Sequence, residues 1–155
     1  MLIHLTIRDL VIVRELELTF KKGMSALTGE TGAGKSILID ALGLALGERS
    51  DHAMIRHGSQ RAEVSAEFDL SDFPAALQHL QDLDLSDGQS CLLRRVLVRD
   101  GRSRAYVNGS PIPLGQLREL AELILDIHGQ HAHQSLLRAT AQRTLLDGYA
   151  GLHTE

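Results

Sequence analysis

Apolar and polar residues alternate over several stretches of the chain, which is typical of β-strands with one buried face. Residues 2–7 and 11–20 are the first two such stretches, and Arg8-Asp9 is expected to connect them. Residues 61–70 are a third. The pattern predicts strands with one wet face at the start and in the middle of the chain.

A hairpin is predicted in the second half of the chain. Residues 91–99 and 102–108 flank Asp100-Gly101, a favoured two-residue turn, and Asn108-Gly109 indicates another turn directly afterwards. Four arginines give the hairpin a basic side that either contacts a phosphate backbone or faces solvent: Arg95, Arg99, Arg102 and Arg104.

Apolar residues recur at helical spacing in four other places. Caps and spacing predict helices from Ser36 to Leu46 with Gly47 as C-terminal cap, from Ser71 or Asp72 to Gln81, from Pro113 past Leu120, and from Ser135 to Leu146.

Two short apolar runs, residues 24–28 and 123–127, predict buried strands. Between the first helix and the strand at residue 61, residues 48–60 form a polar loop with little periodicity. Its Arg49 and Arg56 are either contacts to a ligand or DNA, or solvated charges.

The segment between the strand at 24–28 and the first helix matches a phosphate-binding pattern. It has the sequence GETGAGKS and fills every fixed position of G-x-x-x-x-G-K-[ST]. Gly29, Gly32 and Gly34 let the backbone turn tightly, so that its N–H groups face phosphate oxygens. Lys35 adds a positive charge for the β- and γ-phosphates, and Ser36 offers its hydroxyl to Mg²⁺. We therefore expect a nucleotide site here.

Composition narrows the class of protein. The 155 residues are 43% hydrophobic but only 3% aromatic, so the core must be aliphatic. A net charge of −4 argues against a polybasic nucleic-acid binder, although local basic patches remain. The single cysteine, Cys91, excludes an internal disulfide. No signal peptide or apolar run of about 18 residues is present, which predicts a cytoplasmic location.

The tract His128-Gly129-Gln130-His131-Ala132-His133-Gln134 offers further candidates. Gln130 could reach Mg²⁺ and an attacking water, or be a plain loop residue. The three histidines suggest zinc, but their spacing and the absence of a nearby cysteine do not match structural zinc sites. Asp126 could be the Mg²⁺-linked acid of a complete small kinase, although several strands separate it from the phosphate loop.

These segments together resemble the N-terminal half of the ATPase head in structural-maintenance-of-chromosomes-like (SMC-like) proteins, most closely the bacterial ones of DNA repair and recombination. The resemblance covers essentially the whole chain. Its most specific segment is similar to the family's Q-loop, and the segments that carry it are residues 5–13, 27–37, 46–49, 104–109 and 125–131.

The resemblance implies an α/β fold, a P-loop NTPase of the ABC/SMC head type with antiparallel strands beside the phosphate-loop strand and helix. It implies catalytic roles for Lys35 and Gln130, Mg²⁺ contacts for Ser36 and Gln130, and a position near nucleotide and DNA for Arg56. The residues that would bind ATP are Gly29, Glu30, Thr31, Gly32, Ala33, Gly34, Lys35, Ser36 and Ile37.

The chain departs from the family in what is missing. It contains no Leu-Ser-Gly-Gly signature and no later apolar strand ending in Asp-Glu. In the family these elements follow a long coiled coil, whose start residues 145–151 resemble. We therefore expect residues 1–147 to be half of a head, with the Q-loop at 128–134, and residues 148–155 to begin the coil.

The resemblance also implies partners and activity. They are the C-terminal half of the same head, a second copy joined by ATP-dependent head dimerisation, and DNA, with no membrane and a location at the nucleoid. ATP hydrolysis would drive head engagement and the holding of DNA at double-strand breaks, and residues 1–155 alone would hydrolyse little. The alternative, an ABC transporter subunit, normally has an upstream aromatic residue to stack on adenine, and only Phe20 precedes Gly29.

Overall fold

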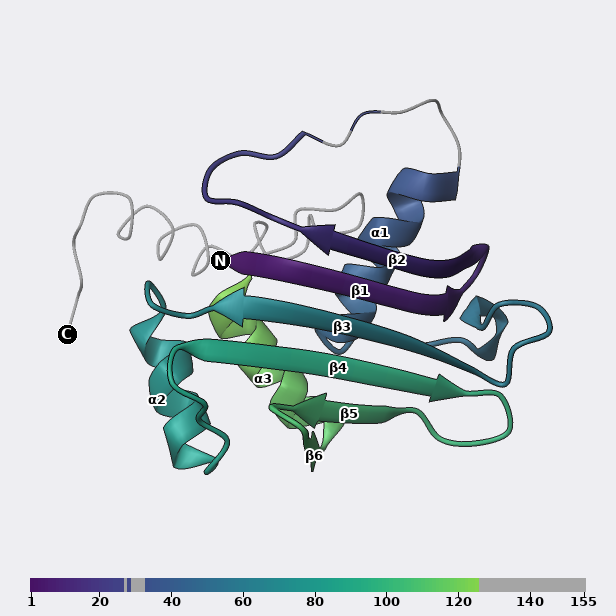
Figure 1. Cartoon of the computed structure of the whole chain (residues 1–155). Helices are drawn as coiled ribbons and strands as arrows, with labels where there is room; N and C mark the ends of the chain where they lie inside the picture. Colours follow the sequence, from purple (N-terminus) through teal and green to yellow (C-terminus); the bar gives the residue numbers. More distant parts are fainter. Residues whose placement is uncertain (27, 29–32, 126–155) are drawn as a thin grey trace, which may run out of the picture. The chain divides into compact units, whose positions relative to one another are not determined.

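The computed structural model describes residues 1–26, 28 and 33–125 (Figure 1). Its centre is an antiparallel six-stranded sheet with the strand order β2-β1-β3-β4-β5-β6. The strands are β1 (Leu2–Leu10), β2 (Val13–Thr19), β3 (Arg61–Asp69), β4 (Ser90–Val98), β5 (Arg104–Val107) and β6 (Ser110–Ile112).

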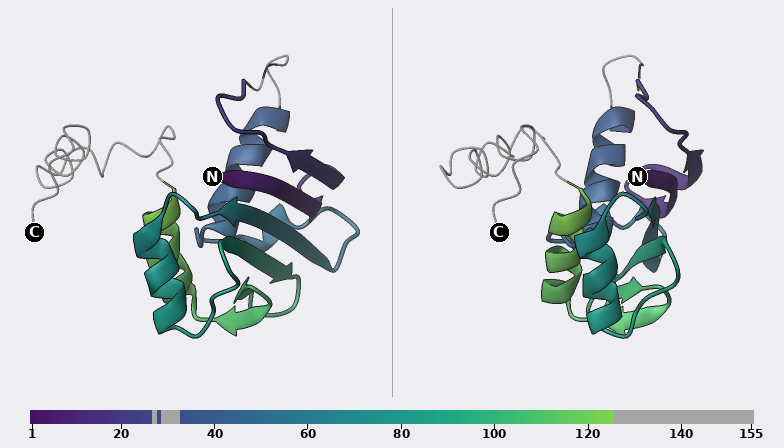
Figure 2. Two further views of the ribbon diagram at one scale, coloured as in Figure 1. Left: turned by 60° about the vertical axis from the view of Figure 1, so that its left-hand side comes forward. Right: turned by 90° about the vertical axis from the view of Figure 1, so that its left-hand side faces the viewer.

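The alternation in the sequence places apolar residues on one face of the sheet. Directly paired residues share a face, so Leu5, Ala66 and Leu93 form one continuous buried row across β1, β3 and β4. We call this the helix-side face, because the helices cover it (Figure 2). The expected strand with one wet face at residues 61–70 is confirmed, since β3 alternates buried and half-buried residues.

The opposite face, which we call the open face, carries paired charges. Arg8 Nε lies 3.1 Å from Glu15 Oε1, and Arg94 Nη1 lies 3.6 Å from Glu63 Oε1. The Arg94 guanidinium also lies over the Tyr106 ring, 4.4 Å from its centroid. These side chains let the open face meet water without a layer of helices.

Two helices pack on the helix-side face and a third packs beside them (Figures 1 and 2). α1 (Ala33–Ala45) contacts β1, β3 and β4, whereas α3 (Leu114–Ile124) contacts β5 and α2 (Pro74–Asp82). A short 3₁₀ helix, η1 (His52–Met54), lies in the loop before β3. The buried helical residues that complete the core are Ile37, Ala41, Leu44, Ala45, Ala76, Leu80, Leu117, Leu120, Ala121 and Ile124.

The first turn of the sheet differs from the sequence prediction. β1 continues through Arg8 and Asp9, and the chain reverses at Val11-Ile12 instead. Backbone hydrogen bonds explain the difference: Val11 N–H donates to Met54 O over 2.7 Å, and Arg56 N–H donates to Asp9 O over 2.8 Å. The loop before β3 therefore holds this turn in place, which local sequence does not encode.

The connection between β4 and β5 is longer than the predicted two-residue turn and spans residues 99–103. Arg99 leaves β4 because it bonds to the loop before β3: its N–H donates to Gln60 O and its Nε donates to Ser59 O. Arg95 is buried on the helix-side face, so it does not belong to a basic surface. The Asn108-Gly109 turn is confirmed, with φ of 47° and 83° at the two residues.

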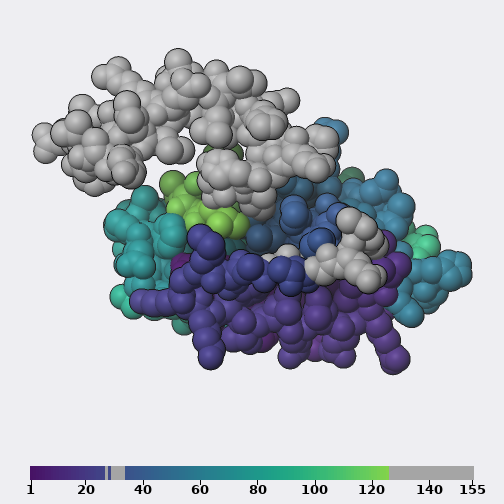
Figure 3. Space-filling model, turned by 90° about the horizontal axis from the view of Figure 1, so that it is seen from above, coloured from purple at the N-terminus to yellow at the C-terminus, as the bar shows by residue number. Residues whose placement is uncertain are grey.

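Neither of the two predicted buried strands is present in the described residues. Met24, Ser25, Ala26 and Thr28 are exposed and outside the sheet, and Figure 3 shows the segment after β2 on the surface beside α1. Leu123 and Ile124 instead continue α3, because Leu117, Leu120 and Ile124 keep helical spacing. The remainder of the second run, residues 126–127, lies outside the described residues.

The helix predictions hold with small shifts. α1 ends at Ala45, and Gly47 follows it with a φ of 97°, which suits a C-terminal cap, as predicted. α2 begins after Phe73, which makes no side-chain cap, so the expected Ser71 or Asp72 cap is wrong. The helix predicted at residues 135–146 lies outside the described residues.

Candidate nucleotide-binding site

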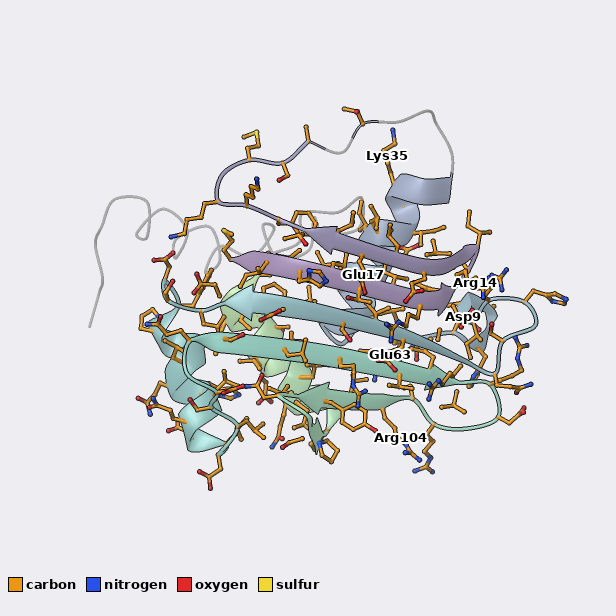
Figure 4. All side chains as sticks on the ribbon, in the orientation of Figure 1. Asp9, Arg14, Glu17, Lys35, Glu63 and Arg104 are labelled. Atoms are coloured by element: carbon orange, nitrogen blue, oxygen red, sulfur yellow. The ribbon has the colours of Figure 1, made fainter. Side chains whose placement is uncertain are left out.

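The end of the phosphate-binding pattern forms the first turn of α1. Ile37 is buried against the sheet, together with Ala41 and Leu44 one and two turns later. These buried residues pack the later turns of α1 against the sheet, whereas Gly34 and Ser36 in the first turn stay exposed. Figure 4 shows the half-buried Lys35 extending from this end of the helix, away from the sheet.

The start of α1 is electrostatically suited to an anion. The first turn of an α-helix presents N–H groups without helical partners and carries partial positive charge. No acidic residue lies in the first turn to neutralise it, and Lys35 adds a full charge. A Cβ on Gly34 would meet nothing within 4 Å, so a ligand can approach its backbone closely. These residues therefore fit a bound phosphate group.

The other predicted members of this site lie largely outside the described residues. Ala33 is the first residue of α1. The candidate ATP contacts before it, Gly29, Glu30, Thr31 and Gly32, lie outside the described residues. The same holds for Asp126, Gln130 and the three neighbouring histidines. The expectation that Ser36 and Gln130 both contact Mg²⁺ thus stays a prediction.

Arg56 is held by Asp9, near the end of β1. Its Nη1 lies 3.9 Å from Asp9 Oδ1, and the same carboxylate oxygen accepts the Ser59 hydroxyl over 2.9 Å. Arg99 Nη2 donates to Arg56 O over 3.3 Å. Among the described residues, these contacts connect Arg56 to the sheet and to its own loop, and none connects it to α1.

Sequence reasoning missed the part played by Asp9. The sequence places Asp9 in a predicted turn. In the structure, its carboxylate accepts the Ser59 hydroxyl and lies near the Arg56 guanidinium, and its carbonyl oxygen accepts the Arg56 N–H, so both groups hold the loop that carries Arg56. An acidic residue at the end of a strand was the available signal. Only the tertiary pairing of Leu10 with Ile55 brings it to the loop.

An apolar groove of about 220 Å³ runs alongside α1. Leu18 and Phe20 line one side, and Leu38 and Leu42 of α1 line the other. The groove continues to Ile39, which is 55% exposed although isoleucine is normally buried. Phe20 therefore packs in this groove.

The described helices include none with the length and apolar character that a membrane crossing requires.

Comparison with known proteins gives consistent results. The profile of the AAA domain family matches residues 4–143. The DNA repair protein RecN of Vibrio cholerae is 52% identical over 97% of this chain, which aligns with 27% of that protein. The chain thus spans about a quarter of the length of the curated relatives it matches.

Solved structures agree on the fold. A structure from work on the ATP-driven dimerization and DNA-stimulated activation of SMC ATPases has a TM-score of 0.68 at 24% identity, over 94% of this chain and 97% of that one. The Smc head domain from Pyrococcus furiosus has a TM-score of 0.71 at 21% identity, over 97% of this chain and 42% of that one. The predicted head-type fold is confirmed, whereas a transporter subunit or a small kinase is not favoured. The chain therefore belongs to the AAA domain family, in which it is similar to the N-terminal quarter of RecN and has the fold of an SMC ATPase head.

Proposed function

We propose that this chain is the ATP-binding N-terminal half of the head of an SMC-like ATPase that acts in DNA double-strand break repair. One observation carries the nucleotide part of the proposal: Gly34, Lys35 and Ser36 lie in the first turn of a helix whose next residue, Ile37, is anchored in the core, and that turn contains no acidic residue. The similarity to RecN, named as a DNA repair protein, supports the biological role.

Each residue of the site has a role in this proposal. Residues 29–34 surround the phosphates with backbone N–H groups, Lys35 neutralises the β- and γ-phosphates, and Ser36 and Gln130 bind Mg²⁺. Mg²⁺ supplies further charge neutralisation, and Gln130 orients the attacking water. Arg56 approaches the nucleotide or DNA from its loop. Positioning and charge account for the catalysis, as is usual in phosphoryl transfer.

The head is proposed to be completed by a C-terminal half of the same protein. The apolar groove along α1 and the exposed Ile39 and Met24 support this, because such side chains are normally covered. That half would add the signature motif, the second metal acid and the catalytic glutamate. Two completed heads would then enclose ATP between them, which is in keeping with the ATP-driven dimerization described for SMC ATPases of the same fold.

DNA is the proposed partner of the assembled protein, and the cytoplasm, at the nucleoid, is its proposed location. The relatives named for DNA repair and the DNA-stimulated activation described for SMC ATPases support both. No membrane partner is part of the proposal.

ATP binding and hydrolysis by residues 1–155 and by a protein that restores the C-terminal half test the proposal. We expect weak nucleotide binding and little turnover by residues 1–155, and DNA-stimulated turnover by the restored head. Lys35→Ala should lower restored-head turnover by about 100-fold or more, because a charge on the phosphates is lost. Lys22→Ala, which changes an exposed lysine before the loop, is the matched control and should leave turnover unchanged.

Two outcomes contradict the proposal. Equal turnover of wild type and Lys35→Ala would remove the nucleotide site from residues 29–37. Full turnover by residues 1–155 that depends on Asp126 would instead identify a complete small P-loop enzyme.

A further inference from the structure

Arg95 is a buried arginine without an acidic partner. It lies on the helix-side face of β4, directly between Val64 and Ala105, and is only 1% exposed. Its Nη2 donates to Ser103 Oγ over 3.2 Å, while its buried Nε has no hydrogen-bond partner. No ion pair of Arg95 occurs among the described residues. Buried arginines are normally paired, so this one needs an explanation.

The nearest charge adds to the problem. Burial, and then the nearby Arg118 guanidinium on α3, lower the pKa of Arg95. Arginine nevertheless stays protonated in proteins, so the core contains a positive charge that no acidic residue among residues 1–26, 28 and 33–125 pairs with. Arg118 donates through Nε to Gly47 O over 2.6 Å, and as a second positive charge it does not neutralise Arg95.

A cavity of about 310 Å³ adjoins Arg95. β5 and β6 line it through Ala105 and Ile112, and the first residue of α3, Leu114, closes another side. The start of the eleven-residue α3, with Pro113 and Leu114, therefore lines the same cavity as Arg95 and Ser103.

Within the part of the chain that the structure describes, no side chain caps the N–H groups in the first turn of α3. Pro113 is the N-cap and supplies no side-chain hydrogen bond, and no acidic residue lies in the first turn. The first helical bond runs from Leu117 N–H to Pro113 O, so the N–H groups of residues 114–116 precede it. A Cβ on Gly115 would meet nothing within 4 Å, which leaves room beside this backbone.

We propose that this cavity binds a small oxyanion, a phosphate or carboxylate group, between Arg95, Ser103 and the start of α3. The guanidinium Nε and the Ser103 hydroxyl donate to the oxyanion, and the helix N-terminus adds N–H groups and partial positive charge. The site is built on β4, β5 and α3 and does not share a residue with the nucleotide site on α1. It therefore does not depend on the proposed function.

Inorganic phosphate is the probe, added to the full chain carrying Lys35→Ala so that the site on α1 does not contribute. Thermal unfolding is followed at constant ionic strength, with chloride replacing phosphate. At tenfold excess over its dissociation constant, phosphate should raise the melting temperature by roughly 4 °C. Acetate in place of phosphate distinguishes the two sources: stabilisation by acetate indicates a carboxylate, and stabilisation by phosphate alone indicates a phosphate group.

Neighbouring arginines provide the matched variants. Arg95→Met removes the charge at similar volume and should abolish the rise in melting temperature. Arg94→Met, one residue away on the open face, should keep it. If Arg95→Met does not fold, amide NMR shifts of Ser103 and Gly115 in the Lys35→Ala chain report the same binding. The proposal would be overturned if the protein showed no thermal shift and none of these amide shifts with up to about 50 mM phosphate or acetate, a concentration well above typical millimolar affinity.

Discussion

The helix-side face of the sheet and the segment after β2, residues 20–28, both contain apolar residues but have different surroundings. Val64 and Leu93 on the sheet are fully buried, whereas Met24 is 100% exposed. Each strand of the sheet has a neighbouring strand, and α1 or α3 of the same chain contacts β1, β3, β4 and β5. Phe20 still pairs with β1, because its N–H donates to Ile3 O over 2.8 Å, but the described residues after it lie outside the sheet. Burial thus requires a neighbour as well as an apolar side chain, and the described residues supply such neighbours to the sheet but not to Met24.

The largest effect is expected where the sheet supplies all the neighbours. Phe68→Ala should lower the free energy of unfolding by about 3–5 kcal/mol, because Phe68 is fully buried between Leu2 and Cys91. Urea unfolding measures the loss. Leu92→Ala, on the neighbouring strand but 39% exposed, should cost less than about 1 kcal/mol. Equal losses for the two variants would mean that the core is not on the helix-side face.

The far end of α1 belongs to the well-packed region, and a glycine tests this. Gly47→Ala should cost about 1–2 kcal/mol, because φ is 97° and an added Cβ would lie 2.8 Å from Arg118 Cγ. Gly58→Ala is the control, since Gly58 has a φ of 85° but open space around it. A larger cost for Gly47→Ala in thermal unfolding isolates the contact between α1 and α3, and identical costs would argue against that contact.

The pH dependence of stability tests whether water is excluded from the buried Cys91 side chain. Burial raises the pKa of its thiol from 9.0 to about 12. Above pH 9 the unfolded chain loses this proton while the folded chain keeps it, so folding stability falls as the pH rises toward 12. Between pH 9 and 10.5 the wild type should lose roughly 1 kcal/mol per pH unit more than Cys91→Ala. Parallel pH profiles for the two proteins would show that water reaches this side chain.

The smallest effect is expected in the segment before α1. Met24→Ser should change the stability of residues 1–155 by less than about 0.5 kcal/mol, because the side chain is exposed. In a protein that restores the C-terminal half, the same change should cost more, since the proposed half-head would then cover it. An equally small cost in both proteins would separate Met24 from the proposed interface.

The site was only partly predictable. The spacing of Gly34, Lys35 and Ser36 identified the first turn of α1, because a phosphate loop is defined by residues close together in the sequence. The surroundings of Arg56 were not predictable, since Asp9 and Arg99 reach its loop only through strand pairing. Arg95 was assigned to a basic surface because alternation alone does not say which face of β4 is buried.

Alternation and local turn signals in the sequence determined most of the strands, the Asn108-Gly109 turn and the helix that follows the phosphate loop, because side-chain periodicity and backbone preferences act over neighbouring residues. The tertiary structure decided which apolar runs became strands, where β1 ends and which arginine entered the core. These outcomes depend on partners distant in the chain, as the pairings of Asp9 with residues 56–59 show. In the apolar run 24–28, the described residues, 24–26 and 28, lie outside the sheet, and the sequence alone could not reveal that.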